Sequence, residues 1–307
     1  MKQLIVTILC AGMSCQTACA TTPPSSCMTV HLLDAETGEP IEGVVCDAQF
    51  RYDKNVALTK KFFQSDTNGI CRIEGPIDYI GTSCGLEKEG YYWQTAQLDF
   101  KGRNRVLNRW EPWNPTIEVK MRKKKNPVPM VARGVDREMI PEWDKSIGFD
   151  LERGDWVAPY GKGRVSDMIF FVQKTSGISG ATCEISFSNK GDGIQEFVPD
   201  QSSGSEFIFP YLAPTNNYSE SMCREKVYTD EYGLKFRTNA KPDAEINHLF
   251  RVRTILDDKG NVQQACYGRI KGELRVSSNG KLYFKYWFNP VPNERSLEYS
   301  GKNLLKK

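Results

Sequence analysis

Apolar and polar side chains alternate along short segments of this chain, and no other feature of the sequence restricts the fold as strongly. Every second residue is apolar in Met28–Leu32, Val44–Phe50 and Ile117–Met121, as in strands that bury one face. Turn signals such as Asp66–Gly69 separate these segments. Long stretches of helical periodicity are absent, although Asn217–Val227 is compatible with one short turn of helix. We therefore predict an all-β protein of two antiparallel β-sandwich domains, the second one jelly-roll-like.

Residues 1–20 have the three parts of a secretory signal peptide. Lys2 gives a basic start, the run Leu4–Met13 is apolar, and the segment ends with small residues at Ala18 and Ala20. The apolar run is too short to span a bilayer, which takes about 20 apolar residues. We expect cleavage after Ala20 and export of the mature chain to the periplasm, the cell surface or the extracellular space.

Two cysteines near the end of this segment leave a second outcome open. Lipid attachment at Cys15 or Cys19 would tether the chain to a membrane. Neither cysteine has a leucine three residues before it, which speaks against this outcome. Later segments are too polar to cross a bilayer, so no transmembrane segment is predicted.

The remaining composition restricts partners and cofactors. The net charge is +3, and the loss of Lys2 lowers it to +2, which argues against a nucleic-acid partner. With two histidines and no Cys-x-x-Cys spacing, we predict neither a structural zinc site nor a cofactor. Seven cysteines follow the signal, an odd number whose disulfide connectivity the sequence leaves open. They are Cys27, Cys46, Cys71, Cys84, Cys183, Cys223 and Cys266.

Two parts of the chain resemble known proteins. The segment Val30–Val44, the turn Ser65–Gly69 and the tripeptide Glu89–Tyr91 resemble the carboxypeptidase regulatory-like domain family. This resemblance implies an Ig-like, transthyretin-like β-sandwich over residues 27–122 that serves as an accessory module without catalytic residues. The closing stretch Ala265–Pro290 is similar to uncharacterised exported bacterial proteins, and this similarity implies no activity.

A basic, proline-containing segment marks a boundary after the first domain. The run Lys123–Lys125 is followed by Pro127 and Pro129, so we predict a linker over residues 123–145 and a second domain over 146–307. Such a run is typical of a solvated linker, and the alternative is contact with an anionic lipid or polymer.

Two features of the second domain predict strands in detail. The continuous apolar run Met168–Val172 indicates a strand buried on both faces. Near the C-terminus, a three-residue loop Ser278–Gly280 would pair Val276 with Leu282 and align the apolar faces of a hairpin. We expect Gly280 to adopt a left-handed conformation in that loop.

Clustered aromatic residues form the first candidate site. Trp93 lies in a Tyr-Tyr-Trp triplet, and Trp110 and Trp113 flank Glu-Pro. These rings either seal the end of the sandwich or provide a stacking platform for a sugar or peptide.

The polar–aromatic stretch 150–167 forms the second candidate site. It contains Asp155, Trp156, Tyr160 and Asp167, which either cap the sandwich or bind a ligand. 

Two acidic residues open that stretch. If the chain is extended there, Asp150 and Glu152 share a face with Cα atoms about 6.6 Å apart, a spacing that suits two carboxylates in glycoside hydrolysis. The same spacing is equally typical of any solvated strand face.

Basic residues recur at alternate positions of two later segments. They are expected on the outward strand faces, as an ordinary charged surface or as a stripe for an anionic polysaccharide. The residues are Arg251, Arg253, Arg269, Lys271 and Arg275.

No complete nucleophile, phosphate-binding or Ca²⁺ motif occurs in the sequence. We therefore predict a noncatalytic binding or scaffolding protein of the cell envelope, with a carbohydrate, a peptide or an envelope protein as partner. The alternatives are a glycan-active hydrolase or lyase that uses carboxylates of the 150–167 region, and a structural subunit of an assembly.

Overall fold

The computed structural model describes residues 22–52, 57–174, 179–199, 204–228, 236–237, 246–272 and 274–305. Strands, turns and loops make up all of these ranges. The prediction of an all-β fold is therefore confirmed. Within the described ranges, the chain forms no helix of the length and apolar character needed to cross a membrane.

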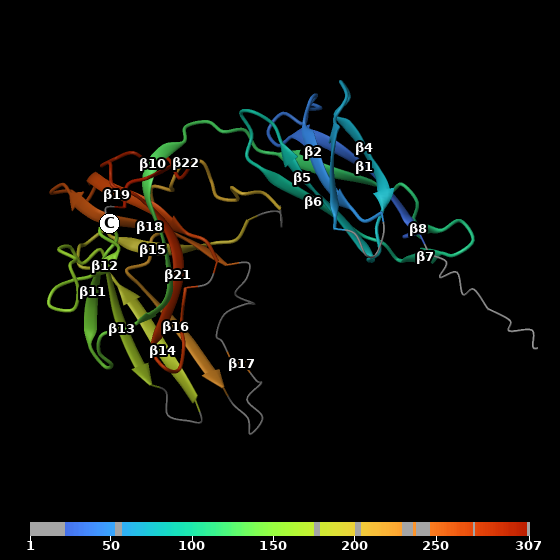
Figure 1. Ribbon diagram of the computed structural model, residues 1–307. Coiled ribbons are helices and arrows are strands. Elements are labelled where there is room, and N and C mark those ends of the chain that lie inside the picture. The colour runs from blue at the N-terminus through green and yellow to red at the C-terminus, as the bar shows by residue number, and fades with distance from the viewer. Residues whose placement is uncertain are drawn as a thin grey trace, which may run out of the picture. The chain divides into compact units, whose positions relative to one another are not determined.

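The chain divides into two compact units, each with its own sheets (Figure 1). The first consists of Met1–Glu89 and Gln94–Met121. The second consists of Gly90–Trp93 and Arg122–Lys307.

Two sheets form the first unit. One contains β1 (Ser25–Asp34), β4 (Ile70–Pro76), β7 (Gly102–Asn104), β8 (Arg109–Glu111) and β9 (Thr116–Met121). The other contains β2 (Val45–Phe50), β3 (Thr59–Gln64), β5 (Gly81–Glu87) and β6 (Gln94–Asp99) in the order β3-β2-β5-β6. Most pairs are antiparallel as predicted, but β1 pairs with β8 and β9 in parallel.

The apolar faces of these two sheets pack against each other. Val30 and Leu32 of β1 are fully buried, and so are Cys46 and Phe50 of β2. The Phe50 ring lies so close to Gly75 of β4 that a Cβ there would be 2.3 Å from the ring. The alternation of side chains along each strand thus builds the core of a sandwich.

The second unit also contains two sheets. The seven-stranded sheet has the order β15-β18-β19-β21-β10-β22, and β20 pairs with β21. Its strands are β10 (Val128–Met139), β15 (Gly193–Phe197), β18 (Asn247–Leu256), β19 (Val262–Ile270), β20 (Arg275–Val276), β21 (Lys281–Asn289) and β22 (Tyr299–Asn303).

The six-stranded sheet of this unit has the order β12-β11-β13-β14-β16-β17. Its strands are β11 (Ser146–Asp150), β12 (Asp155–Trp156), β13 (Met168–Lys174), β14 (Ser179–Ser186), β16 (Ser221–Tyr228) and β17 (Phe236–Arg237). Aromatic rings fill the core between the sheets: Phe149 of β11 packs edge-on against Phe284 of β21, with ring centroids 5.7 Å apart. Such interlocking rings fix how the two sheets stack.

The predicted register of the last hairpin is confirmed. Val276 pairs with Leu282, and both are buried. Gly280 has a φ of 81°, the left-handed conformation that the three-residue loop requires. One-residue slippage would have turned the apolar set toward solvent, which is why the sequence could specify this register.

Two local predictions are wrong. Asn217–Val227 does not form a turn of helix, because β16 occupies Ser221–Tyr228 and pairs with β14. The run Met168–Val172 is a strand, but only alternate residues are fully buried, and Ile169 and Phe171 are half-buried. A continuous apolar run therefore did not require burial on both faces.

The segment 123–145, predicted as a linker, contains the twelve-residue strand β10. This strand pairs with β21 from Val131 to Met139. The prolines did not prevent it, because Pro129 is the second residue of β10, where the pairing with β22 is irregular. The preceding lysines are not simply solvated, since the ammonium of Lys125 lies 4.4 Å from the ring centroid of Tyr211.

Candidate functional site

The predicted aromatic residues are not brought together in one platform. In the first unit, Trp110 Nε1 donates a hydrogen bond to the Ile77 carbonyl at 3.1 Å, and its ring stacks on Phe100. Trp113 lies under the guanidinium of Arg109 at 5.0 Å. Both rings therefore have structural partners.

Trp93 belongs to the second unit, and its side chain is 47% exposed. Its carbonyl accepts a hydrogen bond from the Glu206 amide at 2.9 Å, so the backbone there is fixed while the ring faces solvent. Of the three tryptophans, it has the ring with the most open surface.

The stretch 150–167 separates into side chains with different roles. Trp156 is 4% exposed and packs on Phe149 and Phe170 in the core. Asp155 closes a loop, because its carboxylate accepts hydrogen bonds from the Trp156 and Lys162 amides at 2.8 Å. These contacts support the reading of this stretch as a cap for the sandwich.

Tyr160 is the partly exposed member of the same stretch. Its hydroxyl donates a hydrogen bond to Glu142, and the ammonium of Lys145 lies 5.4 Å from its ring centroid. Glu142 and Lys145 are themselves an ion pair at 3.1 Å, so the three side chains form one surface cluster.

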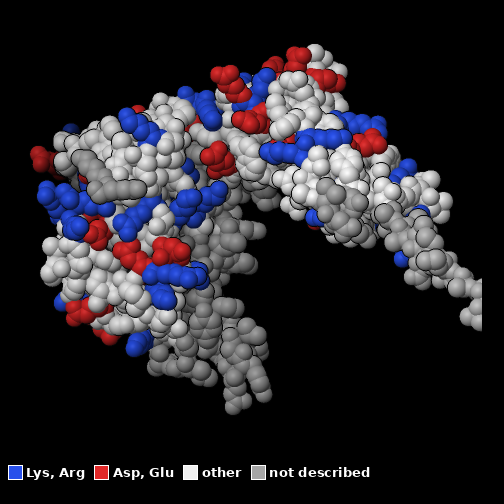
Figure 2. All heavy atoms as spheres, in the orientation of Figure 1, with Lys and Arg blue, Asp and Glu red and all other residues white. Residues whose placement is uncertain are grey.

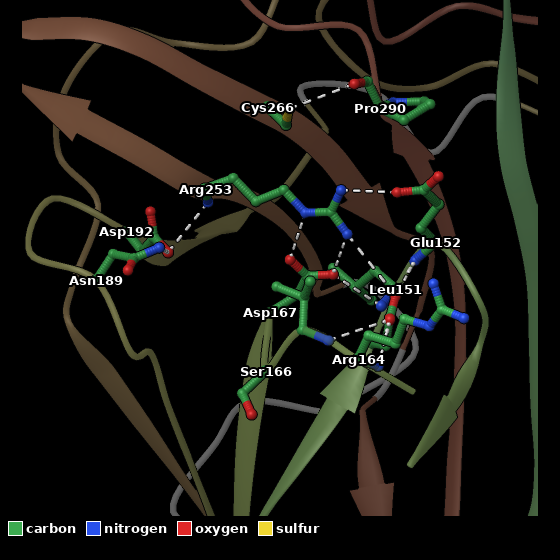
Figure 3. Close-up of polar contacts among 12 residues, drawn as sticks. Leu151, Glu152, Arg164, Ser166, Asp167, Asn189, Asp192, Arg253, Cys266 and Pro290 are labelled. Atoms are coloured by element: carbon green, nitrogen blue, oxygen red, sulfur yellow. Dashed lines mark hydrogen bonds and ion pairs between the residues drawn. The ribbon is translucent and has the colours of Figure 1, made fainter. Parts of the chain in front are cut away.

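Arg253 organises the carboxylates of this region, as Figure 3 shows. Its Nε and Nη2 donate to the two oxygens of Asp167 at 2.8 and 3.0 Å. Its Nη1 donates to Glu152 at 2.7 Å, and Asp150 lies 3.7 Å from Nη2. The bidentate bond is the strong form of a guanidinium–carboxylate contact.

Backbone amides satisfy the remaining carboxylate oxygens. Asp150 accepts from the amides of Glu152, Arg153 and Arg164 at 2.9–3.1 Å. The Leu151 amide donates to Asp167 at 2.9 Å. Buried carboxylates need such partners, so this network holds the loop after β11 against the strand β13.

The backbone of β18 is bent to place Arg253. Arg253 has a φ of 57°, and the pairing of β18 with β19 is irregular between Val252 and Ile255. Asp192 supports this bulge, because it accepts hydrogen bonds from the amides of Arg253 and Thr254 at 3.1 and 2.8 Å. Positive φ at a non-glycine residue persists only where neighbours enforce it.

Burial and ion pairing act against each other in this network. Burial raises the pKa of Asp167, and the hydrogen bonds and charge of Arg253 oppose that rise. For Arg253, burial lowers the pKa, but the bonds to Asp167 and Glu152 outweigh it and the pKa is raised overall. The guanidinium thus compensates a carboxylate that could not otherwise be buried as an anion.

The predicted pair of outward carboxylates is not formed. The strand β11 ends at Asp150, which is 2% exposed, and Glu152 lies in the following turn on the solvent side. Asp167 is 1% exposed. A glycosidase needs two carboxylates that both reach the substrate, and this geometry does not present them.

The predicted outward stripe of arginines is also wrong in part. Arg251 and Arg269 are only 9% and 4% exposed. A second, smaller core, which includes Phe207 and Phe209, covers the part of the outer face of the seven-stranded sheet around Arg251 and Arg269. Arg269 lies 4.7 Å from the Phe209 ring and 4.1 Å from the Trp287 ring, and burial lowers its pKa to about 9.

On the rest of that outer face, Lys271 and Lys285 are exposed, Lys281 and Tyr283 are half-buried, and Trp287 is buried. We call this part the basic face and define it by Lys271, Lys281 and Lys285 with Tyr283 and Trp287. Lys271 and Lys285 lie opposite each other, since the Lys271 amide donates to the Lys285 carbonyl at 2.9 Å. None of the three lysines has a carboxylate within ion-pair distance among the described residues.

Like charges are crowded on the basic face. Burial, Arg269 and Lys285 together lower the pKa of Lys271. Lys285 extends over the Trp287 ring at 5.0 Å, and the Arg275 guanidinium lies over Tyr283 at 4.1 Å. Such an excess of positive charge favours an anionic ligand.

Small residues flank these cations on β10. Ala132 pairs with Trp287 and Gly134 with Lys285, and nothing lies within 4 Å of a Cβ built at Gly134. Asp136, opposite Tyr283, is the acidic residue of this row. Figure 2 shows Lys and Arg gathered in several places on the visible side of the second unit, with acidic residues between them.

The sequence reasoning missed Lys281 and Lys285. The alternation along β21 places them with Tyr283 and Trp287 on one face, so the signal was present in the sequence. Only the pairing with β19 shows that Lys271 joins them.

The described residues contain no group of three or more His, Cys, Asp or Glu side chains that could hold a metal ion. Six of the cysteines that follow the signal are buried free thiols in the structure, namely Cys27, Cys46, Cys71, Cys84, Cys183 and Cys266, and Cys223 is exposed.

No protein-family model and no curated protein matches the chain. Solved structures give weak likenesses. A 3-chlorocatechol 1,2-dioxygenase from Rhodococcus opacus aligns over 34% of this chain and 61% of its own, at 12% identity and a TM-score of 0.26. The chain thus spans about three fifths of the length of that enzyme.

Two further likenesses cover most of both chains. A DUF3823 family protein from Parabacteroides merdae aligns over 85% of this chain and 96% of its own, at 6% identity and a TM-score of 0.22. The major pilin subunit BcpA of Bacillus cereus aligns over 91% and 97%, at 11% identity and a TM-score of 0.23. TM-scores this low carry no argument, and the resemblance to the carboxypeptidase regulatory-like domain stays a prediction.

Proposed function

We propose that this chain is an exported, noncatalytic binding protein of the cell envelope, and that its second unit holds an acidic polysaccharide on the basic face. The signal-like residues 1–20 support export. Residues 27–122 would be the accessory Ig-like module and residues 146–307 the larger part of the binding module. Polymers with a carboxylate, sulfate or phosphate on each repeat share the chemistry that this face recognises.

One observation carries the proposal: Lys271 and Lys285 lie opposite each other, and neither forms an ion pair with a carboxylate among the described residues. By contrast, Arg133 is paired with Glu138, and Arg253 is paired with Asp167. Burial and then the charges of Arg269 and Lys285 lower the pKa of Lys271, so its charged form costs free energy in the unbound protein. A bound anion removes that cost.

The shape of the basic face favours a polymer over a small ligand. It lies on a sheet, and on the β10 side it is flanked by Ala132 and Gly134, whose small size leaves room for a ligand. Tyr283 adds a half-buried ring beside the cations. An extended chain that lies across strands can contact Lys271 and Lys285 at once, which suits the repeating charge of a polyanion.

The carboxylate network around Arg253 supports a noncatalytic role. Asp150 and Asp167 already bond to amides and to the guanidinium. Neither is free to give or accept a proton at a substrate, because both side chains are buried. Glu152 alone reaches solvent, and a single carboxylate does not complete the glycosidase pair.

Binding of the mature chain to polygalacturonate, to the neutral polymer dextran and to polyglutamate tests the proposal. We expect binding to polygalacturonate that weakens as salt rises, and none to dextran. The double variant Lys271→Gln, Lys285→Gln should bind polygalacturonate at least about tenfold more weakly than the wild type, since charge-assisted hydrogen bonds are lost.

The control is the double variant Lys162→Gln, Lys259→Gln, which removes two exposed cations outside the basic face. It should bind as the wild type does. Equal losses in both variants, or tighter binding to polyglutamate than to polygalacturonate, would contradict an acidic polysaccharide on this face.

A further inference from the structure

The hairpin between β7 and β8 in the first unit ends in two exposed apolar residues. Val106 is 93% exposed and Leu107 is 56% exposed. Figure 1 shows this hairpin extending from the sheet that contains β1. Isolated apolar residues are common on surfaces, but an adjacent pair at a projecting tip is a feature of contact sites.

The tip is held in this conformation by its own side chains. Asn104 Oδ1 accepts hydrogen bonds from the amides of Val106 and Leu107 at 3.1 and 3.0 Å. Arg103 donates from Nη2 to Asn108 Oδ1 across the loop. The apolar pair is therefore presented to solvent by a built turn.

Cations surround the apolar pair. Residues 101–111 contain four cations and one acid, Glu111, a net charge of +3 from 4 − 1. Glu111 is already paired with Arg109 at 2.9 Å, whereas Arg105 extends from the tip with no ion-pair partner among the described residues. Apolar residues at a tip with cations behind them match the layers of an anionic bilayer, where headgroup phosphates lie above the acyl region.

The start of the described chain is bonded to the same hairpin. The Ser25 amide donates to the Asn108 carbonyl at 2.9 Å, and Asn108 Nδ2 donates to the Thr22 carbonyl at 3.3 Å. Two residues lie between Cys19 and Thr22, so the three Cα–Cα steps from one to the other span at most about 11 Å. If Cys19 carries the lipid that the sequence allows, the acyl chains enter the bilayer beside this tip.

We propose that the β7–β8 tip is a membrane-contact site for anionic lipid. Val106 and Leu107 enter the interfacial layer, and Arg103 and Arg105 contact phosphate groups. One lipid chain gives only marginal membrane binding, and a second contact of this type makes it stable. The site is separate from the basic face and does not depend on the proposed function.

Co-sedimentation of the non-lipidated mature chain with vesicles tests this site. The vesicles are phosphatidylcholine alone, or phosphatidylcholine with an equal part of phosphatidylglycerol. We expect binding to the anionic vesicles only. The variant Val106→Ser, Leu107→Ser should bind about tenfold more weakly, and Arg105→Gln about fivefold more weakly at low salt.

Matched variants separate this site from other surfaces. Val198→Ser replaces an exposed apolar residue of the second unit, and Arg153→Gln an exposed arginine; both should bind vesicles as the wild type does. The variant Lys271→Gln, Lys285→Gln should also keep vesicle binding. The proposal would be overturned if the lysine variant lost vesicle binding while the Val106, Leu107 and Arg105 variants kept it. It would also be overturned if the wild type did not bind anionic vesicles.

Discussion

Acidification should destabilise the second unit through a single buried histidine. His248 is 1% exposed in β18. Its Nε2 lies 2.8 Å from Arg224 Nη2, and a guanidinium can only donate, so Nε2 is the acceptor and the ring is neutral. Its Nδ1 is buried without a hydrogen-bond partner in the described chain. Protonation would place a second cation against Arg224 in a dry site.

The size of the loss in stability follows from the difference between the pKa values of His248 in the folded and the unfolded chain. Burial and then the charge of Arg224 lower the pKa of His248 from 6.5 to about 3. Above the unfolded-state pKa neither state binds the proton, so the histidine has no effect there. As pH falls below it, only the unfolded chain gains the proton, and stability is lost. At about pH 4.5 the loss is about 2.7 kcal/mol, from 1.36 kcal/mol for each of about two pH units.

The loss at that pH depends little on the folded-state pKa of His248, because any value below about 3.5 leaves about nine tenths or more of the rings neutral. Urea unfolding at about pH 7.5 and pH 4.5 measures it. Carboxylates also titrate in this range, so the wild type is compared with His248→Gln, whose amide oxygen accepts from Arg224 but does not titrate. The variant should lose about 2.7 kcal/mol less than the wild type on acidification.

His31 offers the matched control, since it is the other histidine of the chain and lies half-buried on β1. His31→Gln should keep the wild-type dependence of the second unit's unfolding on pH. The reasoning about His248 is refuted if the wild type and His248→Gln lose equal stability between the two pH values.

Two further substitutions test the charge network and the packing. Arg253→Met should lower the free energy of unfolding by about 3 kcal/mol at neutral pH, because Asp167 is left buried and unpaired. The loss should be smaller in acid, where Asp167 takes up a proton. Urea titrations that give an equal loss for Arg153→Met, at an exposed arginine, would contradict this. Gly268→Ala should cost about 1–3 kcal/mol, because its Cβ would lie 2.2 Å from a buried phenylalanine ring. In the same sheet, Gly134→Ala has open space and should change thermal stability by less than about 0.5 kcal/mol, and similar costs at both glycines would be inconsistent with the packing described.

Part of the candidate site could be predicted from the sequence of the stretch 150–167. Its polarity and rings marked a special loop, and the structure builds a capped loop there. The sequence did not indicate that Asp167 pairs with Arg253, 86 residues away. Pairing over such a distance depends on the order of strands in a sheet and on how two sheets stack, which local patterns do not contain.

The segment around Pro127 shows a case in which the local composition was misleading. The charges and prolines around Pro127 pointed to a linker, yet the alternation of Val131 and Val135 continues into a paired strand. Here tertiary pairing outweighed local composition, since β21 offers a complete partner edge.

By itself, the sequence determined the strand class, the turn positions and the register of the hairpin at Val276–Leu282, because period-two alternation specifies which face each side chain occupies. Only the tertiary structure decided what covers that face. Arg269 and Lys271 occupy the same side of the seven-stranded sheet, but an aromatic layer buries the first and leaves the second in solvent. Burial depends on segments that meet through folding, and so do the charges that remain open for a ligand.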